Sequence, residues 1–240
     1  MTVEKRQKSD GLSEETLSVA AEKSKSRAKS KAAYHHGDLR KALVEAGIEI
    51  VENDGVQALS LRGVARRAGV SQTAPYHHFA DKEALLAAIA ETGFRDLADA
   101  MDADVTARRP APAALPAAHR VQALGFGYVH FAVGHPGRFR LMFGPMIDCK
   151  ENYPSLLQAS MRSYDMIQTA VAARLTEIGT PYPNLEASTM TAWALVHGLA
   201  TLLIDGRFET GQMDKDAVDG LITHATRALQ YGLGREVVHP

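Results

Sequence analysis

The sequence is poor in cysteine, with Cys149 as the single one in 240 residues. One cysteine cannot form an internal disulfide framework or a multi-cysteine metal cluster, and this fits a reducing compartment. The N-terminal segment is rich in charged side chains and contains no apolar run, so we expect no secretory signal. The sequence therefore predicts a cytoplasmic protein.

Known catalytic patterns are missing as well. The sequence has no Gly-x-Ser-x-Gly elbow, no His-Glu-x-x-His pair and no glycine-rich phosphate loop. Cys149 lies in a segment that carries Pro145 and Asp148, without an obvious base to activate a thiol. We therefore do not expect an enzyme. A hydrolase that uses Cys149 or a histidine pair is the alternative.

Two histidine pairs, His35-His36 and His77-His78, are the candidates for metal ligands. Adjacent residues on a helix point in different directions, and no third ligand follows at a matching spacing. We predict neither a metal site nor a cofactor.

Charge is unevenly distributed. The net charge of −1 is too low for an architectural protein that binds DNA without sequence preference. From Gly55 to Ala80, however, no acidic residue occurs, and a local positive face is implied. The basic or imidazole residues of this segment are Arg62, Arg66, Arg67, His77 and His78.

A long run without charge extends from Ala187 to Ile204 and has the length of a short membrane span. Hydroxyl and imidazole side chains interrupt it, and its flanks are the acidic Glu186 and Asp205 instead of basic residues. We expect a helix that is buried in protein on more than one side, and no membrane partner.

The rest of the chain shows helical periodicity and predicts an all-α fold, with an N-terminal helix-turn-helix and a C-terminal helical domain. Residues 1–33 are polar and basic, and two interpretations stay open: a disordered solubilising tail, or an arm that contacts DNA phosphates. The expected division is a tail (1–33), a helix-turn-helix domain (34–80), a connecting helix (81–107), a proline-rich linker (108–116) and a ligand-binding and dimerisation domain (117–240).

Capping residues mark the helix-turn-helix. Asn53-Asp54-Gly55 ends a first amphipathic helix, and Ser60 caps a short helix that Gly69 breaks. Ser71 opens a second short helix through Phe79, with Pro75 close to its first turn, and Asp81 caps a longer helix. The outward side of the second short helix is then free to enter a major groove.

These residues carry a resemblance to a known family. The strings Leu61 to Ser71 (LRGVARRAGVS) and Tyr76 to Leu85 (YHHFADKEAL) resemble the signature of tetracycline-repressor-like (TetR/AcrR) transcriptional regulators, and the resemblance covers residues 34–94. It implies a one-component repressor that binds a palindromic, double-stranded operator as a homodimer. The string Trp193 to Leu199 (WALVHGL) resembles a Trp-His-Gly motif of one subgroup.

The resemblance also implies roles for single residues. Gln72 and Thr73 would read bases, Arg62 would reach a guanine or a phosphate, and Lys82 would bind a phosphate at a helix N-terminus. The full expected DNA-binding set is Ser60, Arg62, Ser71, Gln72, Thr73, Tyr76, His77 and Lys82.

Neighbouring residues receive simpler interpretations. Arg66 and Arg67 are expected to be solvated charges on a helix face, and His78 a packing residue. Three positions depart from the family pattern, namely Gly47, Gly63 and Pro75.

The C-terminal domain is expected to serve two purposes. The helices at 185–205 and 215–231 would form a four-helix dimer interface with a second chain. A small effector, mostly apolar and with one or two polar groups, would bind between the other helices and shift the connecting helix. The alternative for the candidate lining residues is ordinary core packing. These candidates are Phe126, His130, Met142, Phe143, Met146, Tyr164, Gln168, Trp193 and His197.

Overall fold

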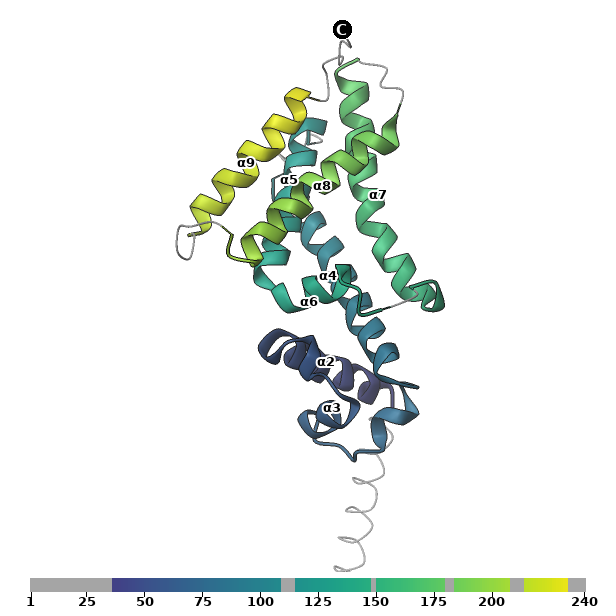
Figure 1. The fold of residues 1–240 in the computed structure, drawn as a ribbon. Coiled ribbons are helices and arrows are strands. Elements are labelled where there is room, and N and C mark those ends of the chain that lie inside the picture. The colour runs from purple at the N-terminus through teal and green to yellow at the C-terminus, as the bar shows by residue number, and fades with distance from the viewer. Residues whose placement is uncertain (1–35, 109–114, 148–149, 180–183, 208–213, 233–240) are drawn as a thin grey trace, which may run out of the picture.

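The computed structural model describes residues 36–108, 115–147, 150–179, 184–207 and 214–232, and within these ranges all regular structure is helical (Figure 1). The predicted all-α fold is confirmed. The tail 1–33 and most of the expected linker lie outside the described residues. The elements are α2 (His36–Asp54), η1 (Val56–Ala58), α3 (Leu61–Arg67), η2 (Ala74–His77), α4 (Lys82–Ala107), α5 (Ala117–Gly134), α6 (Pro136–Phe143), η3 (Lys150–Asn152), α7 (Pro154–Glu177), α8 (Leu185–Ile204) and α9 (Lys215–Gly232).

The helix-turn-helix lies at one end of the molecule and is built from α2, α3 and η2 (Figure 1). Leu43 of α2 and Val64 of α3 are fully buried and join the two helices. The Ser60 side chain caps α3 by accepting a hydrogen bond of 3.0 Å from the Gly63 amide. Gly69 has φ of 69°, a left-handed conformation that glycine adopts without strain, and it makes the turn.

The second helix of this motif is shorter than predicted. Instead of a helix from Ser71 to Phe79, a turn at Gln72 and Thr73 leads into the 3-10 helix η2. Pro75 has no N–H and cannot donate to the carbonyl of Ser71, so the Ala74 amide makes that bond instead, at 3.0 Å. Ser71 consequently does not cap a helix, and its hydroxyl lies 3.1 Å from that of Thr73.

Helix α4 runs from the helix-turn-helix into the C-terminal domain (Figure 1). Asp81 caps it by accepting a hydrogen bond of 2.8 Å from the Ala84 amide, as predicted. Its apolar face is buried against α5, α6 and α7, and Ile89, Leu97 and Met101 are fully inaccessible. One rigid element thus connects the two parts of the protein.

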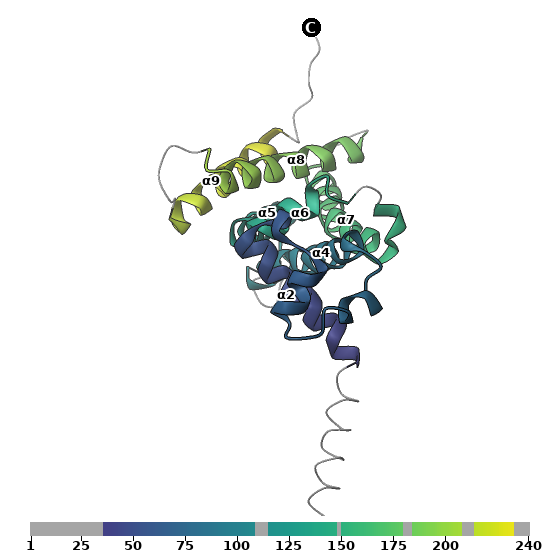
Figure 2. The ribbon, with the colours of Figure 1, turned by 60° about the horizontal axis from the view of Figure 1, so that its bottom comes forward.

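Helices α8 and α9 form a layer on one side of the bundle made by α4 to α7 (Figure 2). Within the single chain only one face of α8 is buried, and 28% of its most apolar 18-residue window is inaccessible. The expected burial on more than one side stays a prediction, which a second chain would have to fulfil. Among the described residues, α8 is the one helix long and apolar enough to cross a membrane by length and composition. The buried residues of this face are Ser188, Thr189, Ala192, Val196 and Ala200.

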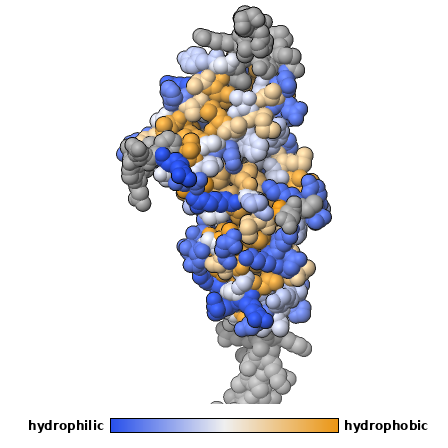
Figure 3. Space-filling model, in the orientation of Figure 1, coloured by the Kyte–Doolittle hydropathy of each residue, from blue (hydrophilic) through white to orange (hydrophobic). Residues whose placement is uncertain are grey.

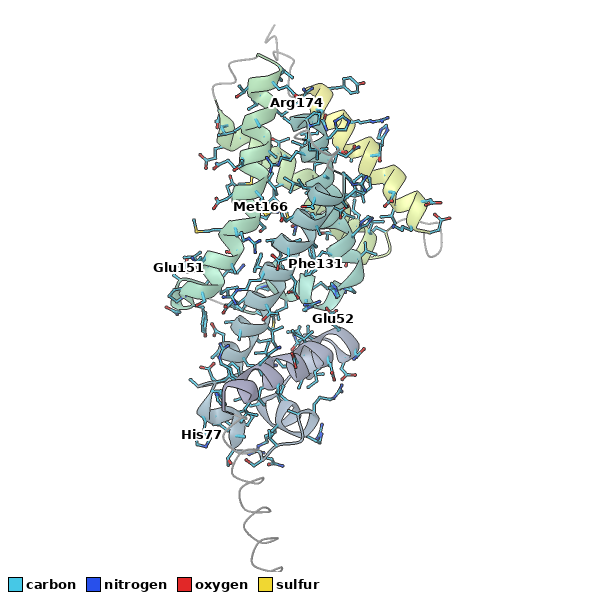
Figure 4. The ribbon with its side chains drawn as sticks, turned by 180° about the vertical axis from the view of Figure 1, so that it is seen from behind. Glu52, His77, Phe131, Glu151, Met166 and Arg174 are labelled. Carbon is cyan, nitrogen blue, oxygen red and sulfur yellow. The ribbon has the colours of Figure 1, made fainter. Side chains whose placement is uncertain are left out.

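A charged contact joins α6 to the helix-turn-helix. The guanidinium of Arg138, which is 6% exposed, donates to Glu52 of α2 at 2.9 Å and to Asp96 of α4 at 2.6 Å. Glu52 also accepts a hydrogen bond of 3.0 Å from the Gly137 amide, and Figure 4 shows it between α2 and the helices of the C-terminal domain. Its carboxylate is therefore held by the first turn of α6.

The backbones of α2 and α6 approach closely at Gly137. A Cβ atom at this position would clash with the carbonyl oxygen of Val51 and lie 2.9 Å from Oε2 of Glu52. Only a residue without a side chain lets the start of α6 lie directly on α2.

We predict that Gly137→Ala lowers the free energy of unfolding by about 1 to 3 kcal/mol, because α6 must move away from α2. Urea denaturation followed by circular dichroism measures this free energy of unfolding. Gly134→Ala is the matched control, since nothing lies within 4 Å of a Cβ atom there. Equal stability of the two variants would contradict the close contact.

Candidate DNA-binding surface and effector cavity

The residues expected to contact DNA gather at the free end of the helix-turn-helix. Figure 4 shows His77 at the lower end of the molecule, opposite the end at which Arg174 lies. Lys82 is half-buried in the first turn of α4, and the other expected residues are exposed, with Tyr76 at 53%. The exposed residues are Ser60, Arg62, Ser71, Gln72, Thr73, Tyr76 and His77.

Backbone donors add to this surface. The first turn of α4 presents free amide groups beside Lys82, and its capping residue Asp81 occupies only the amide of Ala84. Helix N-termini with a neighbouring cation bind phosphate groups well. The start of α4 is therefore suited to a DNA phosphate.

The neighbouring basic residues differ in their partners. Arg67 pairs with two carboxylates of α2, Glu49 at 3.1 Å and Asp54 at 3.5 Å. This pairing holds Arg67 against its own domain, whereas Arg62 extends from the first turn of α3. His78 is half-buried.

A cavity of about 240 Å³ lies in the C-terminal domain between α4, α5, α7 and α8. Its walls are largely aromatic: Phe94 meets Phe143 edge to face at 5.2 Å between ring centroids, and Tyr164 meets Trp193 likewise at 6.4 Å. The lining residues are Phe94, Tyr128, Phe143, Lys150, Ser160, Met161, Ser163, Tyr164, Ile167 and Trp193.

A chain of hydrogen bonds lies behind one wall. The Trp193 indole N–H donates to the Tyr128 hydroxyl at 3.1 Å, and this hydroxyl lies 2.9 Å from Nδ1 of His197. Burial lowers the pKa of His197 and raises that of Tyr128. The imidazole is thus neutral at pH 7, and its hydrogen bond with the Tyr128 hydroxyl links it to the Trp193 ring.

Lys150 brings a positive charge to the cavity. Its ammonium group donates to the carbonyl oxygen of Met142 at 2.9 Å and lies 5.4 Å from the centroid of Phe94. Desolvation by burial lowers the pKa of Lys150, and the neighbouring Glu151 opposes this shift. The sequence analysis missed this residue, together with Phe94 and Tyr128.

Nine residues were predicted to line a ligand site. Three of them, Phe143, Tyr164 and Trp193, line the cavity. His197 packs behind them, 4.7 Å from Phe143 between ring centroids. Met142 is fully buried in the core, and Gln168 is half-buried on α7 outside the lining.

The remaining three candidates lie elsewhere. Phe126 stacks under the guanidinium of Arg108 at 4.0 Å, and His130 contacts Asp219 of α9 at 2.6 Å. Met146 approaches Gln57 of the helix-turn-helix, with 3.8 Å between Sδ and Nε2. The structure does not place these residues around the cavity.

An open groove adjoins the cavity. It has a volume of about 860 Å³ and runs between α4 and α7, where Figure 4 shows Met166. Met161, which is 54% exposed, lines both the groove and the cavity. The groove and the cavity therefore meet at Met161.

Taken together, a helix-turn-helix and a separate helical domain with a cavity define a DNA-binding regulator. Two family models match the chain: "Bacterial regulatory proteins, tetR family" over residues 43–89, and "Tetracyclin repressor-like, C-terminal domain" over residues 121–229. The chain belongs to the TetR family of transcriptional regulators, which bind DNA and respond to ligands. This family is not one of enzymes, so the hydrolase alternative has no support.

Individual relatives agree with this assignment. The uncharacterized HTH-type transcriptional regulator YobS of Bacillus subtilis is 27% identical over 72% of this chain and 83% of its own length. A solved structure of a protein with unknown function from Rhodococcus sp. RHA1 is 34% identical, with a TM-score of 0.70 over 84% of this chain and 98% of that one.

A more distant structure shares the fold. The transcriptional regulator FadR from Bacillus subtilis, solved in complex with stearoyl-CoA, is 11% identical with a TM-score of 0.62, over 82% of this chain and 99% of that one.

We predict that the free energy of unfolding declines as the pH falls from neutral through about 6.5, the ordinary pKa of histidine. The unfolded chain then binds a proton that the half-buried His197 resists, because its pKa is lower in the folded protein. Urea denaturation across this pH range measures the slope, which His197→Gln should reduce.

His135, whose pKa is also lowered, retains its own share of the slope. The exposed His119→Gln is the matched control. A His197→Gln protein with the full wild-type slope would contradict a neutral, half-buried imidazole.

Proposed function

We propose that this protein is a homodimeric repressor that binds a near-palindromic operator and releases it when a small molecule occupies the cavity. The observation that carries the proposal is the course of α4, which begins at Lys82 beside the exposed DNA-binding residues and contributes Phe94 to the cavity wall. This assigns residues 34–80 to DNA binding, 81–107 to the connection and 117–240 to effector binding and dimerisation. Such a protein would act in the cytoplasm.

Base reading would fall to the exposed residues before η2 and at the start of α3. A glutamine such as Gln72 can pair with adenine through two hydrogen bonds, and an arginine such as Arg62 can pair with guanine. Thr73 is exposed in the same turn as Gln72. The short η2 places this turn, rather than a longer helix, at the tip of the motif.

Phosphate contacts would flank these base contacts. Lys82 and the amides of the first turn of α4 offer one site, and Tyr76 and His77 project from η2 beside it. Contacts of this kind fix the orientation of a protein on DNA without reading sequence.

Dimerisation would use the layer of α8 and α9. Met190 and Leu202 of α8 are 45% and 46% exposed, although both are large apolar residues. Figure 3 shows an apolar surface over this part of the molecule. Gly198 lies in the same face with open space around it, which permits close approach of a second helix. A second copy of the chain would cover this face by twofold symmetry.

Two helices, α4 and α6, connect the cavity with the DNA-binding end. Phe94 belongs to α4 itself, and Phe143 ends α6, whose first turn binds Glu52 of α2. A ligand that displaces these rings would therefore act on both helices that position the helix-turn-helix. The two helix-turn-helix motifs of a dimer must match operator half-sites that are about 34 Å apart. A change in the distance between the two motifs therefore lowers operator affinity.

The proposal is tested by selecting DNA fragments with the purified protein and repeating the selection with variants. We expect an inverted repeat, bound more weakly by Arg62→Ala and Gln72→Ala by roughly fivefold to a hundredfold, which corresponds to about 1 to 3 kcal/mol. Arg67→Ala is the matched control, since Arg67 pairs with Glu49 and Asp54. The absence of any enriched sequence would refute a role in operator binding.

For the dimer, we expect Leu202→Glu to convert the protein to monomers, because two carboxylates would be buried at the apolar contact. Size-exclusion chromatography with light scattering gives the mass. Val133→Glu, which changes a residue of α5 that is 43% exposed, is the control and should remain a dimer. A Leu202→Glu protein with the mass of two chains would exclude this interface.

A further inference from the structure

We propose that the cavity binds a small monocarboxylate, whose carboxylate pairs with the Lys150 ammonium group while its apolar body lies between the aromatic walls. This inference rests on the cavity's role as the effector site, and it names the chemical class of the effector.

The position of Lys150 carries the proposal. Its ammonium group has three N–H donors, and the Met142 carbonyl accepts one of them at 2.9 Å. Phe94 presents its ring to the same group at 5.4 Å. Because Lys150 is itself a lining residue, its other donors are within the reach of a ligand in the cavity.

Charge in the cavity is of one sign. Among the described residues that line it, Lys150 is the one with a full charge, and none is acidic. Glu151 favours the charged form of Lys150, but its side chain is exposed and does not line the cavity (Figure 4). Partial burial disfavours the ammonium ion, so a carboxylate that replaces the lost water would gain a charge-assisted hydrogen bond.

Apart from the Tyr164 hydroxyl, the other polar groups of the lining already have partners. The Tyr128 hydroxyl lies between Trp193 and His197. Ser160 and Ser163 each donate their hydroxyl proton to a backbone carbonyl of α7, at 2.8 and 3.1 Å. These partnered groups are therefore weak competitors for a ligand, and Lys150 is the main charged determinant, with the Tyr164 hydroxyl as a second possible donor.

The size of the cavity limits the apolar part. Its volume of about 240 Å³ lies below the range of about 300 to 1,000 Å³ that is usual for drug-sized ligands. Five aromatic rings, one each from α4, α5, α6, α7 and α8, line it, and such walls favour a flat or compact body. A carboxylate with a single aromatic ring or a short chain fits both constraints, and phenylacetate is a suitable probe.

Trp193 provides a direct readout, because it is the only tryptophan of the chain and lines the cavity. The experiment titrates the full-length protein, without DNA, with phenylacetate and with its neutral analogue phenylacetamide, and follows tryptophan fluorescence. We expect a saturable change with phenylacetate and an affinity for phenylacetamide that is about tenfold to a hundredfold lower.

Variants of Lys150 separate charge from packing. Lys150→Met should weaken phenylacetate binding by about tenfold to a hundredfold and bring it to the level of phenylacetamide. Lys150→Arg keeps the charge and should retain binding of the carboxylate. Lys41→Met is the matched control, since the side chain of Lys41 is 73% exposed on α2, and circular dichroism verifies that each variant is folded.

Three results would overturn the proposal: equal affinities for phenylacetate and phenylacetamide, undiminished phenylacetate binding by a folded Lys150→Met protein, or no saturable change with phenylacetate at millimolar concentration. None of them bears on the selection of operator DNA, which uses no ligand. If the protein binds the carboxylate but selects no DNA, the proposed ligand of the cavity is supported and the proposed repressor function is refuted.

Discussion

The relation between the two parts of this regulator depends on the buried guanidinium of Arg138. Because Arg138 is 6% exposed, its charge is stable only if it is paired, and its partners, Glu52 and Asp96, belong to α2 and α4. The amide of Gly137 binds the same Glu52 carboxylate. The first turn of α6 is thus fixed to the helix-turn-helix by charge and by close backbone contact, while its last residue, Phe143, lines the cavity.

This arrangement gives the effector cavity a short mechanical connection to the DNA-binding end. The three helices that meet at Arg138 include α4, whose Phe94 packs edge to face on Phe143 of α6. A change at this ring pair acts on two elements at once, because the two rings pack directly against each other. Such coupling does not depend on the expected proline-rich linker (108–116).

Most helix boundaries were predictable because local signals set them. Ser60 and Asp81 cap α3 and α4 as their residue types indicate, and Gly69 forms the expected turn. The length of η2 was predicted wrongly, because the missing N–H of Pro75 outweighed the helical pattern around it. The sequence predicts burial of α8 on more than one side, but periodicity cannot tell whether an apolar face is covered by the same chain or by another, and the single chain buries one face.

The two sites differ in how far the sequence reveals them. The candidate DNA contacts lie in one short segment, so a local signature is enough to propose them. The cavity takes residues from distant elements, and helical spacing cannot tell which of them converge. His130 and Tyr128 are neighbours on α5, yet His130 contacts α9 and Tyr128 lines the cavity. Lys150 follows a break at Gly144 and has no periodic pattern around it.

The uncovered apolar face of α8 makes the stability of the protein depend on its concentration. If burial of Met190 and Leu202 requires a second chain, part of the stabilising free energy appears only on association. Thermal stability would then increase with protein concentration, and a scarce regulator would exist partly as a less stable single chain. A palindromic operator needs two helix-turn-helix motifs, one from each chain of a dimer. Occupancy of the operator would therefore increase more steeply than the number of chains in the cell.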